Sequence, residues 1–459
     1  MVIPEDACPN CVRLEAELLE LKQRLAALEA RFKQNSSTSS QPPSTDKPWK
    51  PKSERLKTGR ASGGQKGHIG KTLELSNQPN TTIILPVEGF CTCGQCWDSV
   101  AVDSHVTRQV HDLPEIQLFV TEYQAQTKTC PNCQKTEQAC FPKEVSARVQ
   151  YGAGVHGLAT YLNAFHFIPL QRTSQIIQSI CGANLSEATI DNALKVAAEQ
   201  LLGFEANLKL GLLEQPVLHA DETGCKVSGV LNWVHVITCN LMTFYAHHQK
   251  RGFAALETMK VLPVFTGTLM HDAWSTYFRL PAIHALCNAH LLRELRGLAE
   301  IQGQIWAGEL RVALQGVYHT LKLGQLTDAD KTVFMNCFDA LVELGLASNP
   351  VVVRTTMKRG RVAQSKGRNL ALRCQQHKDA VLRFLLDARV PFDNNLAERD
   401  IRMVCVKRKV SGGFRSAEGA KAFCRIRSYI STLRKQGLSV WAGLVSVFRG
   451  DVLMPNFLC

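Results

Sequence analysis

The stretch PVLHADETGCKVSGVLNWVHVIT, residues 216–238, decides the fold that this sequence predicts. It opens with a short apolar run that ends in an acid, which is typical of a buried strand. Residues 230–238 then alternate apolar and polar side chains, as a second strand would. The segments that follow predict a third strand (242–248), a helix (252–260), a fourth strand (266–272), and a fifth strand that leads into a helix (282–301).

This order of elements predicts an α/β fold, and it is the order found in the catalytic core of ribonuclease H-like nucleotidyl transferases. In that core the first strand is central, and the fourth strand pairs beside it in parallel. Asp221 ends the first expected strand and Asp272 ends the fourth. We therefore expect these two carboxylates to be neighbours, although they are far apart in the sequence.

A third acid normally lies on a helix that follows the fifth strand and packs back over the sheet. Here residues 301–389, which are mostly helical in pattern, intervene before that helix. The sequence PFDNNLAERDIRMVCVKRK (391–409) restores it, and Glu398 is its acid. We expect a ribonuclease H-like core formed by residues 211–300 and 390–450, with a helical insertion between them.

Three carboxylates in this order suit a metal-dependent reaction on a phosphodiester. Asp221, Asp272 and Glu398 could hold two divalent cations about 4 Å apart for in-line attack by water or a 3'-hydroxyl. Mg²⁺ and Mn²⁺ are the expected cofactors because they prefer hard oxygen ligands. Asn394 and Arg402 should share a helix face with Glu398, where they would offer an amide and a guanidinium to phosphate oxygens.

Other acids close to this trio have simpler explanations. Glu222 follows Asp221, so on a strand it points to the opposite face unless the strand end twists it inward. Asp393 suits a helix cap. Asp400 is displaced from the helix face that carries Glu398. We expect these three competing acids to be structural.

Positive charge surrounds the third acid, and a second basic cluster lies in the insertion at residues 354–368. Such clusters suit contacts with the phosphates of DNA. His284, Cys287 and His290 are of metal-ligand types, but their spacing across a strand-to-helix junction rarely points all three together. His290, near a helix start, could instead contact a phosphate. The candidate DNA-binding residues are Arg402, Lys407, Arg408, Lys409, Arg415 and His290.

The segments before the core predict several small units. Leucines at heptad spacing predict a short coiled coil at residues 1–33, which either self-associates or docks on its own protein. Residues 34–75 are rich in Ser, Pro, Gly and Lys, and predict a basic flexible linker. Residues 149–210 look helical, with a cap at Ser186 that resembles a helix-turn-helix. The second helix of that unit would either read DNA or pack on the core.

Cysteine pairs in residues 76–148 predict a small zinc-binding domain. Two CxxC knuckles would complete a tetrahedral site of four cysteines. The intervening residues 107–126 alternate like a strand pair that would bring the knuckles together. Cys91 and Cys140 could each replace a member of a pair. The four ligands of this structural Zn²⁺ would be Cys93, Cys96, Cys130 and Cys133.

Composition restricts the class of protein further. Lys and Arg number 53 against 40 Asp and Glu, which gives a net charge of +13 and favours a polyanionic partner. The N-terminus lacks the pattern of a signal peptide, and no run of about 18 apolar residues occurs. We expect a cytoplasmic protein with no membrane partner, so its 17 cysteines are unlikely to form a disulfide framework.

Taken together, these motifs resemble the insertion sequence 66 family of bacterial transposases over nearly the whole length. The specific elements are HADETG (219–224), MHDAWSTY (270–277), CNAHLLREL (287–295) and DNNLAERDIR (393–402). The resemblance implies a DDE mechanism with Asp221, Asp272 and Glu398 in the catalytic positions. It also implies terminal inverted repeats and target DNA as substrates, a multimeric nucleoid-associated complex, and accessory transposition proteins.

Two other functions fit the same residues. A ribonuclease H-like nuclease would use identical acids without strand transfer, since a fold and its acids do not fix the substrate. A DNA-binding regulator derived from an inactive transposase is the alternative without catalysis. The intact acids favour an enzyme, and the coiled coil and long insertion favour a transposase that pairs DNA ends.

Overall fold

A computed structural model describes residues 72–353 and 362–457, together with isolated positions between 14 and 70. Most of the predicted coiled coil, most of the linker and most of the basic cluster at 354–368 lie outside the described residues. Leu14, Leu18 and Leu25 are described, and they are helical and exposed. These positions agree with a helix, whereas the pairing of two such helices stays a prediction.

A five-stranded mixed sheet organises the described chain, in the strand order β5-β4-β3-β6-β7. The first strand of this sheet, β3, is central; it pairs antiparallel with β4 and parallel with β6. The expected pairing of the first and fourth strands is therefore observed. The strands are β3 (Val217–Val227), β4 (Val230–Thr238), β5 (Thr243–His248), β6 (Thr268–His271) and β7 (Ile283–Leu286).

Both faces of the sheet are covered by helices, as alternating side chains of the strands require. Leu218 and Ala220 of β3 join one apolar cluster with α5 (Leu202–Leu213) and α6 (Phe253–Met259). Farther along the strand, Cys225 and Val227 join another cluster with α13 (Asn395–Ser411). The helix α14 (Ala417–Lys435) contributes to both clusters and lies along β5.

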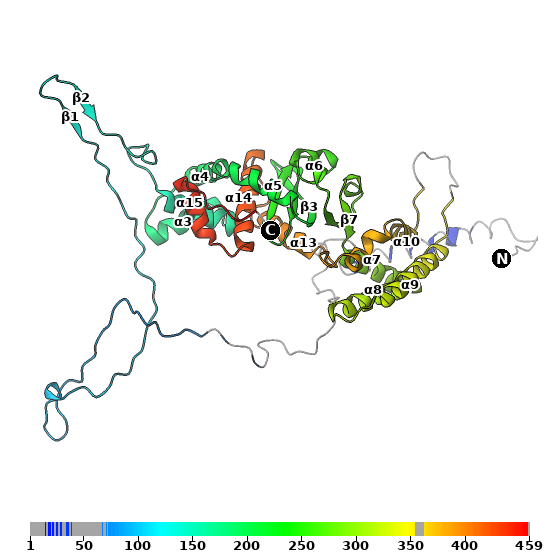
Figure 1. Ribbon diagram of the computed structural model, residues 1–459, viewed down its shortest axis with the longest axis horizontal. Coiled ribbons are helices and arrows are strands. Elements are labelled where there is room, and N and C mark those ends of the chain that lie inside the picture. Colours follow the sequence, from blue (N-terminus) through cyan, green and yellow to red (C-terminus); the bar gives the residue numbers. More distant parts are fainter. Residues whose placement is uncertain are drawn as a thin grey trace, which may run out of the picture.

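The long insertion forms a helical bundle with its own apolar core. Leu295, Leu310, Phe338 and Leu370 are buried in that core, away from the two clusters of the sheet. Figure 1 shows the bundle on the side of β7, while α3 (Leu170–Cys181), α4 (Glu187–Gln200) and α15 (Val440–Arg449) lie on the other side of the sheet. Its helices are α7 (Asn288–Gln302), α8 (Ile305–Lys322), α9 (Asp328–Ala347), α10 (Lys366–Gln376), α11 (Lys378–Val381) and α12 (Arg383–Leu386).

The helices that precede the sheet in the sequence pack against the last two helices of the chain. Ser186 caps α4, where its hydroxyl accepts the N–H of Thr189 as the sequence predicts. Buried residues of α4 face α2 and α14, while its exposed side carries Glu187 and Glu199. The packing of α4 on these helices is observed, and DNA recognition by α4 stays a prediction. The helices before the sheet are α2 (Ala153–Thr160), the π-helix η3 (Tyr161–Phe165), α3 (Leu170–Cys181) and α4 (Glu187–Gln200). The C-terminal helix is α15 (Val440–Arg449).

The cysteine-rich segment differs from the expected strand pair. Residues 107–126 contain no regular secondary structure, and Val110 and Phe119 are exposed. This part of the prediction was wrong, because an apolar strand face needs a packing partner and none covers this segment in the described chain. Regular elements here are the 3₁₀ turn η2 (Trp97–Ser99) and the antiparallel strands β1 (Thr127–Thr129) and β2 (Thr136–Gln138).

Candidate active site

The register of the sheet sets the positions of the first two acids. His219 of β3 pairs with Met270 of β6. Two residues further along each segment, the same register reaches Asp221 and Asp272. Asp221 accepts the N–H of Glu222 at 2.8 Å, while Asp272, just after β6, accepts the N–H of Trp274 at 3.1 Å. Asp221 therefore lies on β3 and Asp272 directly after the adjacent parallel strand β6.

Electrostatics show that the acids act on one another. The pKa of Asp221 lies well above its usual range, first because the side chain is buried and then because Glu222, Asp272 and Glu398 repel its charge. The third acid thus reaches the same neighbourhood across the long insertion. Carboxylates that repel one another suit the binding of a divalent cation, because the ion would offset the repulsion.

Glu222, next to Asp221, has hydrogen-bond partners of its own. Its carboxylate accepts the hydroxyl of Tyr277 at 2.6 Å and the Nε–H of Arg251 at 2.9 Å. The guanidinium of Arg251 also lies over the rings of Trp233 and Trp274, at 5.0 and 4.5 Å from their centroids. Glu222 is thus held by local partners, and its charge still acts on the neighbouring first acid.

Glu398 lies in the first turn of α13 and is only 20% exposed. Its Oε1 is 3.7 Å from Nδ1 of His290 and 3.7 Å from the guanidinium of Arg293. Oε2 is 3.9 Å from the guanidinium of Arg402, which agrees with the shared helix face expected for these two residues. None of these separations is a hydrogen bond, so the carboxylate is surrounded by donors without being bound.

Asn394 does not offer its amide to a substrate, contrary to our expectation. The side chain is buried; its Nδ2–H donates to the carbonyl of Ala220 at 2.9 Å, and its Oδ1 lies 2.9 Å from Nδ1 of His219. Its backbone N–H also meets Sγ of Cys287 at 3.2 Å. These contacts fix the start of α13 against the strand that carries the first acid. The sequence pattern gave no signal of this role.

Asp400 faces away from Glu398 and anchors the same helix to the sheet. Its Oδ2 accepts the hydroxyls of Thr238 at 2.7 Å and Thr243 at 3.0 Å, and lies 2.9 Å from Nζ of Lys435. The N-cap of α13 is Asn394, so the predicted cap at Asp393 was wrong by one residue; Asp393 accepts the N–H of Asn395 at 3.1 Å from the position before the cap. Both competing acids therefore have structural partners.

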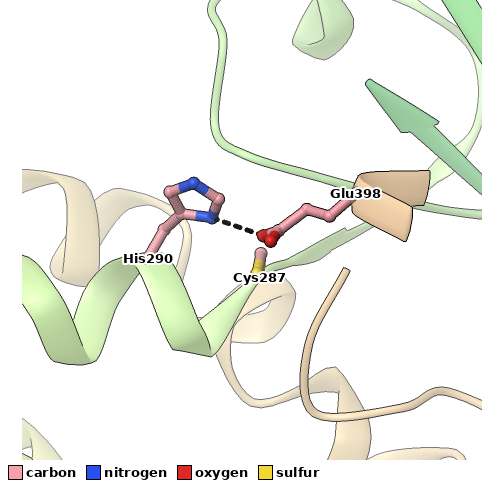
Figure 2. Close-up of side chains that lie close together, drawn as sticks. All are labelled: Cys287, His290 and Glu398. Atoms are coloured by element: carbon pink, nitrogen blue, oxygen red, sulfur yellow. Dashed lines mark ion pairs between the residues drawn. The ribbon is translucent and has the colours of Figure 1, made fainter. Parts of the chain in front are cut away.

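Cys287 and His290 converge on Glu398, as Figure 2 shows. His284 instead lies 3.2 Å from Nε2 of His271, so the three residues of this spacing do not point together. Within the described chain, Cys287, His290 and Glu398 are the one group of three or more metal-ligand types whose ligand atoms lie within 4.8 Å of one another. Sequence spacing could not reveal a group that includes a residue from α13.

The two cysteine knuckles do not meet in the structure. Cys130 and Cys133 lie at the turn between β1 and β2, whereas Cys93 and Cys96 lie just before η2. In Figure 1 the β1–β2 hairpin lies away from the blue segment that contains η2. The irregular segment between the knuckles provides no pairing that would join them, so a shared zinc site stays a prediction.

The basic residues of α13 and of the loop after it divide into two groups. Arg402, Lys409 and Arg415 are exposed and face solvent. Arg408 instead donates to the carbonyl of Gly224 at 2.7 Å, which connects α13 to β3. Lys407 is partly buried, and burial lowers its pKa. The exposed group is placed to meet a polyanion.

The fold and site together define a mixed α/β protein in which Asp272 and Glu398 lie close enough to Asp221 to raise its pKa, and exposed basic residues lie on the helix that carries Glu398. A model described as Transposase IS66 family matches residues 148–422, and the chain belongs to this family. Residues 6–74 match a second model, described as a family of unknown function (DUF6444).

A curated relative adds little about function. A stretch of 72 residues is 36% identical to an uncharacterized protein, y4jO, of Sinorhizobium fredii. The match covers 16% of this chain and 22% of that protein, so the chain spans about a fifth of the relative's length. No helix in the described part of the chain combines the length and apolar character that crossing a membrane requires.

Proposed function

We propose that this protein is a DDE transposase that cleaves DNA at transposon ends and joins the freed 3'-hydroxyl to target DNA. Family membership supports the transposase class. The strand order around β3 and the position of α13 support a ribonuclease H-like core with a helical insertion. The observation that carries the proposal is the aligned register of Asp221 and Asp272, with Glu398 acting on the charge of the first acid.

Asp221, Asp272 and Glu398 are the catalytic residues of this proposal, and they would hold Mg²⁺ or Mn²⁺. Bound there, such ions would supply Lewis-acid activation of the attacking oxygen and stabilise the leaving one. The parallel register of β3 and β6, continued by two residues, supports a placement of the first two carboxylates side by side before any substrate arrives. Arg402 and His290, close to Glu398, would meet oxygens of the scissile phosphate.

The path of the DNA would follow the exposed basic side chains of α13 and the loop after it. Arg402, Lys409 and Arg415 would contact phosphates, which positions a duplex without reading its bases. Arg408 and Lys407 would support DNA binding mainly through contacts within the protein and through the electrostatic potential of their charges. A DNA substrate also implies association with the bacterial nucleoid.

Other parts of the chain have supporting roles in this proposal. Self-association through the N-terminal heptads would pair two DNA ends, and accessory transposition proteins would join the complex. A structural Zn²⁺ held by both cysteine knuckles would order residues 76–148, provided that the intervening segment folds to bring the knuckles together. Loss of about one metal equivalent on replacing Cys130 and Cys133 by Ser would support that zinc site.

The experiment combines the purified full-length protein with duplexes that carry the terminal repeats of its own element, in Mg²⁺ and in Mn²⁺. Cleavage at the ends followed by a joined product is the expected result. Hydrolysis without any joined product would favour the nuclease instead. Unchanged function of Asp272→Ala in a transposition assay would favour a regulator whose acids are not used.

A further inference from the structure

Three side chains of different chemistry meet next to the proposed catalytic acids. Cys287 precedes α7, His290 lies in its first turn, and Glu398 approaches from α13. One ligand atom from each lies within 4.8 Å of the others. Figure 2 shows the imidazole and the carboxylate pointing toward each other, with the thiol beside them. The insertion thus returns the chain so that α13 completes a group begun at the end of β7.

Two polar atoms in this group lack the partners that buried atoms normally have. Nδ1 of His290 and Oε1 of Glu398 are both buried, and neither makes a hydrogen bond. Their separation of 3.7 Å is too long for a hydrogen bond to one another. Such a pair leaves a place between the atoms for a group that binds both.

The protonation states suit a metal ion. Burial, followed by the charges of Arg293 and Arg373, lowers the pKa of His290 to about 3, so the imidazole is neutral and able to bind a metal. Cys287 is buried and its pKa is raised to about 12, chiefly by burial, so it is a thiol in the free protein. A coordinating cation would displace that proton to solvent, because metal binding favours the thiolate.

We propose that Cys287, His290 and Glu398 form a binding site for a borderline-soft divalent cation such as Zn²⁺, separate from the carboxylates of Asp221 and Asp272. A sulfur, a nitrogen and an oxygen ligand are the set that zinc accepts, with a fourth position left for water. Magnesium would not take the thiolate. Thiolate and carboxylate together match the charge of the ion, which limits the repulsion from nearby Arg293.

Occupancy of this site would regulate the proposed reaction, and this part of the inference rests on the proposed function. Glu398 belongs to both sets of ligands, so an ion held with Cys287 and His290 withdraws it from Asp221 and Asp272. Zinc would then inhibit DNA cleavage even when magnesium is present in excess. The site formed by Cys287, His290 and Glu398 would therefore be inhibitory.

The binding test uses Co²⁺, whose thiolate complexes absorb light, on the full-length protein. Wild type should bind about one equivalent more than Cys287→Ser, with the matching loss of thiolate absorption. Cys374→Ser is the matched control, because Cys374 is also fully buried and its pKa is also raised to about 12. Equal stoichiometry and equal absorption in wild type and Cys287→Ser would overturn the site.

A second variant tests the same site in case Cys287→Ser does not fold. His290→Gln keeps a polar side chain at the position and should lose the same equivalent of Co²⁺, with a thermal midpoint close to that of the metal-free wild type. Retention of the full Co²⁺ stoichiometry by folded His290→Gln would also overturn the site. Neither measurement requires DNA, so the result does not depend on catalysis.

The regulatory arm adds Zn²⁺ to the cleavage assay with Mg²⁺ in excess. Inhibition of wild type that is weakened at least about tenfold in Cys287→Ser is the expected result, since the variant keeps all three carboxylates. Identical zinc inhibition of both proteins would remove the regulatory role. Absence of any cleavage by wild type in Mg²⁺ alone would count against the proposed function, while the Co²⁺ result would still decide the metal site.

Discussion

The side-chain amide of Asn394 donates a hydrogen bond of 2.9 Å to the carbonyl of Ala220, the residue directly before Asp221. This hydrogen bond joins the start of α13 to the central strand across an insertion that folds as a separate helical bundle. The position of α13 relative to the strand of the first acid is therefore fixed in part by a buried amide. It does not depend on the length of the intervening chain.

Replacing Asn394 by Ala should destabilise the protein and impair cleavage more than it impairs DNA binding. Two buried partners, the carbonyl of Ala220 and the imidazole of His219, lose their hydrogen bonds, which costs about 2–4 kcal/mol. Urea unfolding measures the change in stability. Asn395→Ala, at the exposed neighbouring position, should be close to wild type. Equal effects of the two substitutions would contradict the role given to Asn394.

Glu398→Gln should abolish cleavage while leaving DNA affinity nearly unchanged, because the amide keeps the shape and loses the metal-binding charge. Cleavage in Mg²⁺ and in Mn²⁺, together with a binding titration, measures the two effects separately. Glu418→Gln, at an exposed acid in the first turn of α14, is the control. Cleavage by Glu398→Gln in either metal would show that the third acid lies elsewhere.

Asp221→Asn should stabilise the metal-free protein near neutral pH. The folded-state pKa of Asp221 is raised, so its ionised form opposes folding above that pKa, and the penalty disappears below the pKa of the unfolded chain. The gain in thermal midpoint should therefore be clear at about pH 7 and small at about pH 3.5. Mg²⁺ should stabilise wild type more than the variant. A gain in stability that is largest in acid would have the wrong sign.

Breaking the Asp400–Lys435 pair should loosen α13 from the sheet. Either Asp400→Asn or Lys435→Met leaves a partly buried charge without its partner, which costs about 3 kcal/mol. The double variant should lose less than the sum of the two single variants, as expected for groups that touch one another. A double-mutant cycle of unfolding free energies measures this coupling. Additive losses would show that the pair does not act as a unit.

Lys409→Ala and Arg415→Ala should weaken DNA binding and lower the slope of its salt dependence by about one unit for each phosphate that the variant no longer touches. Both side chains are exposed. Arg408→Ala should instead reduce stability, because its guanidinium donates to the carbonyl of Gly224. Binding measured over a range of salt concentrations separates these cases. A full salt dependence in Lys409→Ala would exclude that residue from the DNA path.

Local pattern alone predicted much of the core. Alternation and apolar runs identified the five strands of the sheet, because burial of a strand face leaves a mark on consecutive residues. The expectation that Asp221 and Asp272 are neighbours came instead from the order of elements, which matches ribonuclease H-like enzymes, and the parallel pairing of β3 with β6 agrees with it. The segment 107–126 shows the limit of this logic: its alternation predicted strands, but no partner surface covers it in the described chain.

The sequence by itself determined the strands and the family, because these depend on periodicity and on motifs that each occupy a few consecutive residues. Only the tertiary structure decided what surrounds Glu398. Its neighbours Cys287 and His290 lie at the start of α7 and are separated from it in the sequence by the whole insertion, and Asn394 joins the start of α13 to β3 by hydrogen bonds. No spacing in the sequence encodes such an arrangement, because it depends on how the whole insertion packs.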